Sequence, residues 1–340
     1  MTRRTARALG AAIGLALCAG GATWIVAAAG ARTGADGVAG SSWTMSPFTR
    51  HDELFPLLQS DGATFACPVS GKPVRWRGAY VFSPAAVVRD GRVYLLFRAE
   101  DAVGTRGGTS RIGLAESRGG FHFEADPLPV LYPDRDAFLE YEREGGCEDP
   151  RVVEREDGTY VMTYTAFNGT LARLSVATSP DLRTWTKHGL AFGKAKGGRY
   201  ADLWSKSGAI VCRRVGDRLV ATKVNGRYWM YWGETDIYLA VSDDLVEREP
   251  VLKEKRTGKR LGALFGKGQY EVQFDRLDPS AVIARCERYF LRAERQNEVS
   301  GQMENTAFVE GMVPFRGKWF VYYTMAEAGI GVATSEQILD

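Results

Sequence analysis

The sequence has very few of the side chains that most often bind metals. Its 340 residues include three histidines, His51, His122 and His188, and five cysteines, with no His-x-x-x-His pair and no Cys-x-x-Cys. A structural zinc site or a histidine-based metal hydrolase is therefore not expected. We predict neither a metal nor a cofactor.

An excess of charge of one sign is also missing. Lys and Arg number 44 against 41 Asp and Glu, which leaves a net charge of +3. A protein that binds nucleic acid through counterion release needs a clear positive excess or a basic cluster. The predicted partners therefore exclude nucleic acid. Hydrophobic residues make up 45% and charged residues 25%, which is typical of a globular chain and excludes wholesale disorder.

A long apolar run occurs near the amino terminus. Arg3, Arg4 and Arg7 precede an uncharged run over residues 8–31 that ends in small residues. This order is typical of a secretory signal peptide, so we predict a secreted or periplasmic protein. The run is also long enough to span a bilayer, so an uncleaved anchor formed by residues 8–31 is the alternative. Only this segment is expected to contact a membrane.

Composition divides the chain into three parts. Residues 1–31 are the predicted signal peptide or anchor, residues 32–50 form a flexible leader rich in Gly, Ala, Ser and Thr, and residues 51–340 form one folded domain. Four cysteines fall in that domain and allow three pairings: Cys67, Cys147, Cys212 and Cys286. One disulfide would suit export, and four isolated thiols suit a buried core equally well.

The folded part repeats a β-hairpin pattern. A β-branched and aromatic run is followed by a turn and by a second run that ends in Ala-x-Ser. Asp-Gly or Asn-Gly turns precede the first three repeats, which is typical of strands joined by tight turns. The paired runs are 92–98 with 112–117, 160–165 with 174–179, 228–232 with 237–242, and 319–323 with 330–335.

The spacing of these repeats predicts a propeller. Ala115 and Ala177 are 62 residues apart, and Ala177 and Ala240 are 63 apart. A period near 60 residues with several strands per unit is typical of propeller blades. Ala240 and Ala333 are 93 residues apart, which is about half a period more than one. One blade is therefore expected to be incomplete.

Each repeat is preceded by a short polar segment. These segments are Ser83-Pro84-Ala85, Glu148-Asp149-Pro150-Arg151, Lys206-Ser207-Gly208 and Glu310-Gly311-Met312. In a propeller the first strand of each blade lies at the axis, so these segments should converge there. Glycoside cleavage needs acid and base groups that meet from distant positions. Taken alone, the Asp149-Pro150 step suits an ordinary turn equally well.

Several motifs between residues 80 and 335 together resemble glycoside hydrolase family 130, whose five-bladed propellers include β-mannoside phosphorylases and β-1,2-mannosidases. The motifs are residues 97–101 (FRAED), 110–115 (SRIGLA), 145–151 (GGCEDPR), 206–210 (KSGAI), 228–234 (YWMYWGE) and 308–311 (FVEG). The resemblance implies an all-β, five-bladed β-propeller, and the 93-residue interval predicts that its fourth blade is incomplete. It implies a β-mannoside oligosaccharide as the ligand.

The resemblance also implies roles for individual residues. Asp149 matches the proton donor of the family. Its neighbour Arg151 favours an ionised carboxylate and burial opposes it, so the resting state is open at this stage. Arg98 and Asp101 match contacts to mannose hydroxyls, which a charged pair can bind through several directed hydrogen bonds. Further candidate sugar contacts are Arg151, Lys206, Trp232 and Glu310, although an aromatic strand residue such as Trp232 is more often core.

Two positions bear on the choice between water and phosphate. Arg173 and Lys206 match residues that hold phosphate in the phosphorylases, and an ordinary salt bridge is the alternative for both. Glu234 stands where hydrolytic members carry a glutamate that helps to activate water. A carboxylate there repels phosphate and suits a general base, so inverting hydrolysis is favoured, with a turn-capping role as the alternative.

The sequence departs from the family in the incomplete blade. The segment that carries a second glutamate in a Glu-Pro-Gly-Pro context is absent, and Glu271 is a substitute that spacing does not support. Ser83 also replaces an expected asparagine. We favour an exported inverting β-mannosidase with Asp149 as acid and Glu234 as base. The alternatives are a phosphorylase with inorganic phosphate as co-substrate, and a catalytically impaired mannoside-binding propeller.

Overall fold

The computed structural model describes residues 17–20, 23–29, 44–45, 47–101, 108–233, 237–251, 268–286, 289–295, 307–326 and 329–336. Within these ranges the regular structure consists of β-strands, one four-residue helix, α1 (Leu139–Glu142), and one 3₁₀ turn (Asp52–Leu54). The all-β prediction is confirmed.

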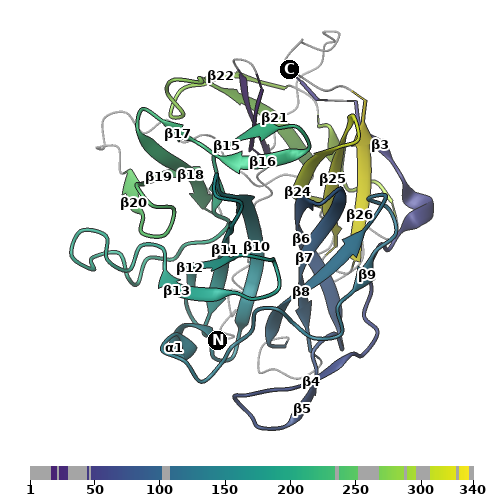
Figure 1. The fold of residues 1–340 in the computed structure, drawn as a ribbon, viewed down its shortest axis with the longest axis vertical. Helices are drawn as coiled ribbons and strands as arrows, with labels where there is room; N and C mark the ends of the chain where they lie inside the picture. The colour runs from purple at the N-terminus through teal and green to yellow at the C-terminus, as the bar shows by residue number, and fades with distance from the viewer. Residues whose placement is uncertain are drawn as a thin grey trace, which may run out of the picture.

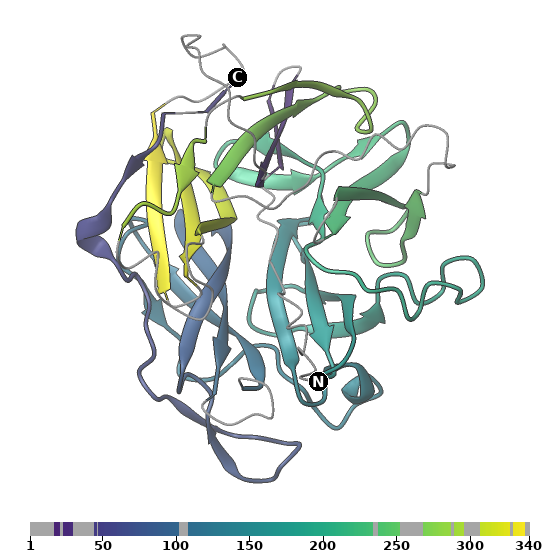
Figure 2. The same ribbon diagram turned by 180° about the vertical axis from the view of Figure 1, so that it is seen from behind.

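The strands form antiparallel units that lie around a shared centre (Figures 1 and 2). The first unit contains β6 (Tyr80–Arg89), β7 (Arg92–Glu100), β8 (Ser110–Ser117) and β9 (Glu124–Ala125). The second contains β10 (Gly146–Glu154), β11 (Tyr160–Phe167), β12 (Ala172–Ser179) and β13 (Thr186–Leu190). The third contains β14 (Ala209–Ile210), β17 (Lys223–Val224), β18 (Arg227–Gly233), β19 (Ile237–Ser242) and β20 (Glu249–Val251).

The last unit joins the two ends of the chain. It contains β24 (Ala307–Phe315), β25 (Lys318–Met325), β26 (Gly329–Ser335) and β3 (Thr49–Arg50). The shorter pairs outside these units are β4 (Thr64–Ala66) with β5 (Pro73–Arg75), and β15 (Cys212–Val215) with β16 (Arg218–Ala221). β6 lies against both β10 and β24, so the first strands of three units surround the centre.

The repeated Ala-x-Ser pattern has a structural explanation. The four predicted hairpins are confirmed, and their alanines occupy equivalent registers: Leu95↔Ala115, Met162↔Ala177, Met230↔Ala240 and Val321↔Ala333. Each alanine is buried in a different apolar cluster, where a small side chain suits close packing. In the first three repeats the serine two residues later accepts a backbone N–H of the following turn, as in Ser179 Oγ from Leu182 N at 2.8 Å.

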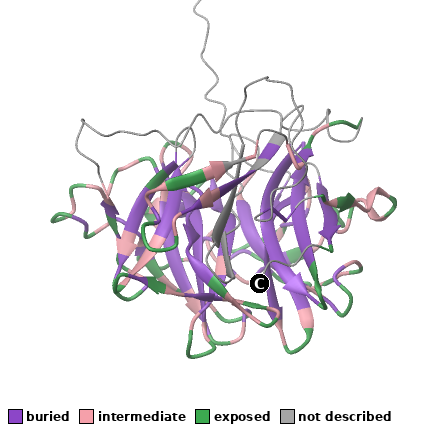
Figure 3. Cartoon of the chain, turned by 90° about the horizontal axis from the view of Figure 1, so that it is seen from above, coloured by how far each residue is buried: buried purple, intermediate pink, exposed green. Residues whose placement is uncertain are grey.

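Apolar side chains of neighbouring sheets pack together in shared clusters, and Figure 3 shows that most strand residues are buried. Leu96 and Leu114 of the first unit share a cluster with Met162 and Tyr164 of the second. Fully burying a side chain of this size stabilises a fold by about 1.5–3 kcal/mol. The sheets are therefore held together by apolar packing between their faces. The polar side chains at the starts of the inner strands lie at the centre, outside these apolar clusters.

The unit after β20 is built differently from the others. β21 (Gly268–Phe274) pairs with β22 (Val282–Arg285) and with β23 (Leu291–Arg292). On its other side β21 pairs with β2 (Thr23–Ala29), which forms a hairpin with β1 (Leu17–Gly20). The apolar amino-terminal segment thus pairs with the unit in which spacing predicted missing strands. Its role as a signal peptide or anchor stays a prediction, and the described residues contain no helix long and apolar enough to cross a membrane.

Part of the predicted leader belongs to the folded body. Thr44 and Met45 are buried, and Ser335 Oγ donates to the carbonyl oxygen of Met45. β3 pairs with β26, and Met45 and Phe48 pack in the apolar cluster of the last unit, so part of the leader 32–50 lies against that unit. The four cysteines of the domain are free thiols, which excludes the disulfide alternative for them.

Candidate active site

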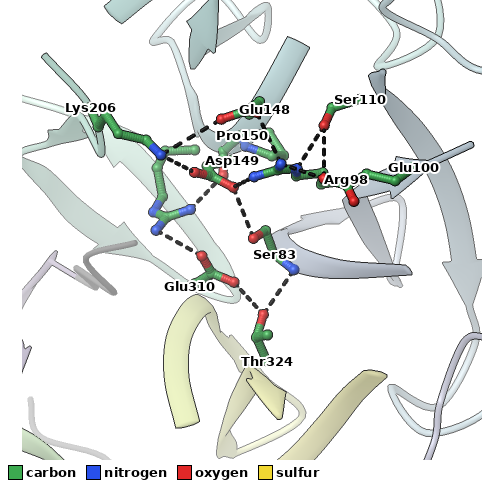
Figure 4. A network of polar contacts seen from close by, with 11 residues as sticks. Ser83, Arg98, Glu100, Ser110, Glu148, Asp149, Pro150, Lys206, Glu310 and Thr324 are labelled. Atoms are coloured by element: carbon green, nitrogen blue, oxygen red, sulfur yellow. Dashed lines mark hydrogen bonds and ion pairs between the residues drawn. The ribbon is translucent and has the colours of Figure 1, made fainter. Parts of the chain in front are cut away.

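Three inner strands carry a β-bulge where they reach the centre. The bulge comes at Ser83 in β6, at Asp149 in β10 and at Glu310 in β24. Ser83 and Asp149 have φ angles of 49° and 47°, a region that residues other than glycine adopt rarely and that is concentrated at functional sites. A bulge re-aims the side chains beside it, and these three point into one polar network (Figure 4).

Asp149 lies at the middle of this network and is 2% exposed. Its Oδ1 accepts hydrogen bonds from Arg98 Nη1 and from Ser83 Oγ, each at 3.0 Å. Lys206 Nζ lies 3.4 Å from Oδ2. Residues from β6, β7 and the segment before β14 therefore surround one carboxylate of β10.

Arg98 connects this carboxylate to two others. Its Nη2 lies 2.5 Å from Glu100 Oε1 and 2.9 Å from Glu148 Oε1, and its Nε donates to Ser110 Oγ at 2.9 Å. Lys206 Nζ lies 3.6 Å from the second oxygen of Glu148. Such paired and hydrogen-bonded groups are the form in which charges are tolerated in a protein interior.

Glu310 closes the network on the side of β24. Its Oε1 lies 3.4 Å from Arg151 Nη2, and its Oε2 accepts a hydrogen bond of 2.5 Å from Thr324 Oγ1. The same threonine hydroxyl accepts the backbone N–H of Ser83 at 2.8 Å. The structure thus brings Asp149, Lys206 and Glu310 together from three separate parts of the sequence.

The electrostatics of the site settle the resting state of Asp149. Burial raises the pKa of this carboxyl, but the charges of Lys206, Arg98 and Arg151 outweigh burial and hold the pKa well below its usual range. Asp149 is therefore an anion at rest. For Glu148, Glu100 and Glu310 burial dominates and raises the pKa of each, although Arg98 or Arg151 opposes it.

This lowered pKa predicts how the stability of an Asp149→Asn variant compares with wild type across pH. A carboxyl whose folded pKa is depressed stabilises the fold above its unfolded pKa of about 3.9, and this stabilisation is lost as pH falls towards the folded value. We expect the difference in Tm between wild type and Asp149→Asn to be larger at pH 7 than at about pH 3. Thermal unfolding followed by circular dichroism measures it.

Asp243→Asn is the matched control for this measurement, because Asp243 is exposed and forms a surface pair with Arg227 at 2.7 Å. Its Tm should differ little from wild type at either pH. A difference for Asp149→Asn that grows as the pH falls would contradict the assignment of Asp149 as the resting anion.

Other predicted site residues have contacts outside this network. Asp101 Oδ2 lies 2.6 Å from Arg111 Nη1, and its Oδ1 accepts the backbone N–H of Thr109 at 3.0 Å. These contacts close the connection between β7 and β8. The proposed contact of Asp101 to a mannose hydroxyl stays a prediction.

The contacts of Arg173 are those of an ordinary salt bridge, and the contacts of Trp232 are those of a core residue. Arg173 Nη2 lies 2.9 Å from Asp202 Oδ1, and its guanidinium lies 5.2 Å from the ring centre of Tyr141. Trp232 is 3% exposed and packs against Phe192 at 4.8 Å between ring centres. Neither residue belongs to the network of Figure 4.

Two glutamates, Glu234 and Glu271, were candidates for the base that activates water. Glu234 lies outside the described residues. Glu271 is fully buried in β21, where its Oε1 accepts the backbone N–H of Met45 and its Oε2 lies 3.7 Å from Cys286 Sγ. These contacts give Glu271 a structural role that holds residues 44–45 against β21.

No individual role was predicted from the sequence for four members of the network: Glu100, Ser110, Glu148 and Thr324. Glu100 and Glu148 lie inside motifs that were recognised, next to Asp101 and Asp149, so the motifs contained a signal for both. Thr324 follows a run of aromatic and aliphatic residues in its strand, and no neighbouring residue in the sequence indicates that it belongs to a polar site. Within the described ranges no group of three or more His, Cys, Asp or Glu side chains could hold a metal.

Comparison with known proteins shows which family this chain belongs to. Residues 50–259 match the profile of glycoside hydrolase family 130, which is described as beta-1,4-mannooligosaccharide phosphorylase. A curated relative, 1,2-beta-oligomannan phosphorylase of Thermoanaerobacter sp. (strain X514), is 30% identical over 317 residues that cover 79% of this chain and 96% of that protein. The chain belongs to glycoside hydrolase family 130.

Two solved structures are similar over most of their length. A glycosyl hydrolase from Bacteroides ovatus is 36% identical, with a TM-score of 0.81 over 86% of this chain and 95% of that one. A second structure is 34% identical, with a TM-score of 0.82 over 87% of this chain and 95% of that one. Its description states that the family of mannoside phosphorylases contains glycoside hydrolases that target beta-1,2 mannosidic linkages in Candida mannan.

Proposed function

We propose that this protein hydrolyses β-1,2-mannosidic bonds with inversion, and that Asp149 is the general acid. The charge balance of the central network is the observation that carries the choice of water over phosphate. Three cations, Arg98, Arg151 and Lys206, face four carboxyl groups in the described part of the site. Even with one carboxyl protonated, the network has no surplus positive charge with which to bind a phosphate dianion.

The relatives support the same substrate class. The solved relative at 36% identity is described as a glycosyl hydrolase, and the description of the one at 34% identity states that the family contains glycoside hydrolases that target beta-1,2 mannosidic linkages. Sugar hydroxyls would bind to the donors of Arg98 and Lys206 and to the acceptors of Glu148. Glu234 is the proposed base that activates water, which is the role of the second carboxylate in an inverting mechanism.

A second candidate function is phosphorolysis, because the curated relative at 30% identity is a phosphorylase. In that reaction inorganic phosphate is a co-substrate, and Arg173 and Lys206 would hold it. The contact of Arg173 with Asp202 at 2.9 Å neutralises part of the charge that phosphate would need. Hydrolysis is therefore the proposal that we favour.

We also infer that the antiparallel units are blades of a five-bladed β-propeller. The unit around β21 would be the incomplete fourth blade. Export, with residues 1–31 as signal peptide or anchor, is part of the same proposal. It is supported by the charge and hydropathy of the amino terminus alone.

Incubation of the purified full chain with β-1,2-mannobiose, with and without inorganic phosphate, tests the proposed reaction. We expect mannose in both buffers, and proton NMR should detect α-mannose before mutarotation, as inversion requires. If mannose 1-phosphate forms instead, and only in the buffer with phosphate, the reaction is phosphorolysis and the proposal of hydrolysis is wrong. Calorimetric binding of mannobiose without turnover in either buffer would make the protein a binder instead.

A further inference from the structure

Lys206 reaches the central network from a segment that belongs to no strand. The segment, residues 203–208, lies between β13 and β14, and residues 205–207 within it are buried. Lys206 Nζ lies 3.4 Å from Asp149 Oδ2 and 3.6 Å from Glu148 Oε2 (Figure 4). A lysine ammonium is carried on a flexible stem, so its place between two carboxylates depends on how firmly its backbone is held.

Arg98, a second cation that contacts Asp149, is fixed by its own side chain. Its guanidinium lies within 3.0 Å of three carboxylates and 4.7 Å from the ring centre of Phe82. Both ion pairs of Lys206 are longer, at 3.4 and 3.6 Å. At these distances the carboxylates restrain the ammonium less, because Coulomb attraction weakens with distance. The backbone around Lys206 therefore has a larger share in placing it.

Ser205 makes three hydrogen bonds, two of them to β12. Its backbone N–H donates to Ala172 O at 3.1 Å, and its Oγ accepts the backbone N–H of Leu174 at 2.9 Å. The hydroxyl donates its own proton to Leu203 O at 3.1 Å. The pairing of β13 with β12 reaches only as far as Ser175. Ser205 therefore continues the edge of the sheet, with one backbone group and one side-chain group.

The rest of this backbone is held by two further strands. Lys206 O accepts the backbone N–H of Gly233 at 2.9 Å, at the end of β18. Gly208 O accepts a hydrogen bond of 2.5 Å from Thr163 Oγ1 of β11. Gly233 directly precedes Glu234, the proposed base. The Lys206 backbone thus connects the side of the proposed acid to the strand end that precedes the proposed base.

We infer that Ser205 is a positioning residue that holds the Lys206 ammonium against the Asp149 carboxylate. Leu174 is buried, so loss of the Ser205 hydroxyl would leave a buried backbone N–H without this acceptor, which is unfavourable. The edge of β12 and the backbone at Lys206 should then shift together. The effect on Lys206 is testable without a substrate, and the effect on turnover rests on the proposed function.

The stability of the Asp149 anion gives the first test. Burial raises the pKa of Asp149, and Lys206 is the largest of the charges that lower it. If the ammonium moves away, the anion contributes less to the stability of the fold. At pH 7, Asp149→Asn should therefore lower Tm by about half as much in a Ser205→Ala background as in wild type. Equal losses in the two backgrounds would overturn the positioning role.

Chemical modification reports the position of Lys206 directly. Lys206 should react slowly with acetic anhydride, because its side chain is 9% exposed and ion-paired, whereas the side chain of Lys194 is 81% exposed. In full-length Ser205→Ala, acetylation of Lys206 relative to Lys194, measured by mass spectrometry, should rise at least about threefold. Ser205→Gly removes the same hydroxyl and should give the same rise. An unchanged ratio in both variants would overturn the inference.

Turnover should also respond to this displacement. Ser205→Ala should lower kcat on β-1,2-mannobiose by about tenfold to a hundredfold, because misplacing a group of the site by about 1 Å can cost about a hundredfold. A variant as active as an active wild type would count against the inference. If wild type cleaves no mannobiose, the proposed function is wrong, and the Tm and acetylation measurements still decide whether Ser205 positions Lys206.

The matched control is Ser179→Ala, at the other end of β12. It removes a buried hydroxyl that accepts the backbone N–H of Leu182 at 2.8 Å, away from the central network. This variant should leave kcat and the acetylation of Lys206 at wild-type values, and it should not change the effect of Asp149→Asn on Tm. A control that matches Ser205→Ala in all three measurements would show that loss of any buried hydroxyl in β12 is sufficient, and would overturn the specific role of Ser205.

Discussion

Replacement of Asp149 by asparagine is expected to lower the rate of β-1,2-mannobiose hydrolysis by about a thousandfold, because the amide keeps the shape of the side chain and cannot act as the acid. Substrate affinity should change much less, since the donors of Arg98 and Lys206 remain in place. Mannose release measured by anion-exchange chromatography over a range of substrate concentrations gives kcat and KM separately.

The control for this variant is Asp202→Asn, because the Asp202 side chain is 84% exposed and its ion pair is with Arg173, which lies outside the central network. Hydrolysis by Asp202→Asn should stay within about twofold of wild type, as for most surface substitutions. If Asp149→Asn releases mannose as fast as wild type, the acid is another residue and the assignment of Asp149 is wrong.

The largest expected effect on stability is that of Arg98→Met. Arg98 is 11% exposed at its side chain and compensates three carboxylates, those of Glu100, Glu148 and Asp149. Removing one partner of a buried ion pair costs about 3–5 kcal/mol, because the remaining charge is left buried without compensation. We expect a loss in the free energy of unfolding at the upper end of this range, measured by urea denaturation at pH 7.

Arg92→Met makes the same change six residues earlier on the same strand. Arg92 pairs with Glu116 at 2.6 Å, with side chains 35% and 25% exposed, and such a pair contributes about 1 kcal/mol or less. The comparison therefore separates the buried network from the general cost of losing an arginine. Equal losses for the two variants would show that the network adds nothing to stability.

The candidate site was partly predictable. Three of the polar segments that begin the repeats each contain one of Asp149, Lys206 and Glu310, and the repeat predicted that the segments converge at one axis. The motif around Asp101 did not reveal that its carboxylate contacts Arg111 and the backbone N–H of Thr109, just before β8. A motif gives the residue type at a position, but the partner of a side chain depends on atoms that the motif does not contain.

The sequence alone determined the strands, their pairing into hairpins and the polar start of each unit, because alternation, turns and small buried residues are local properties. Only the tertiary structure decided that Asp149 is an anion while burial dominates at Glu310. Both carboxyls are buried to the same degree, and the difference comes from which cations reach them across separations such as 51 residues for Arg98 and Asp149. Coulomb interactions depend on distance in space, and chain order does not specify that distance.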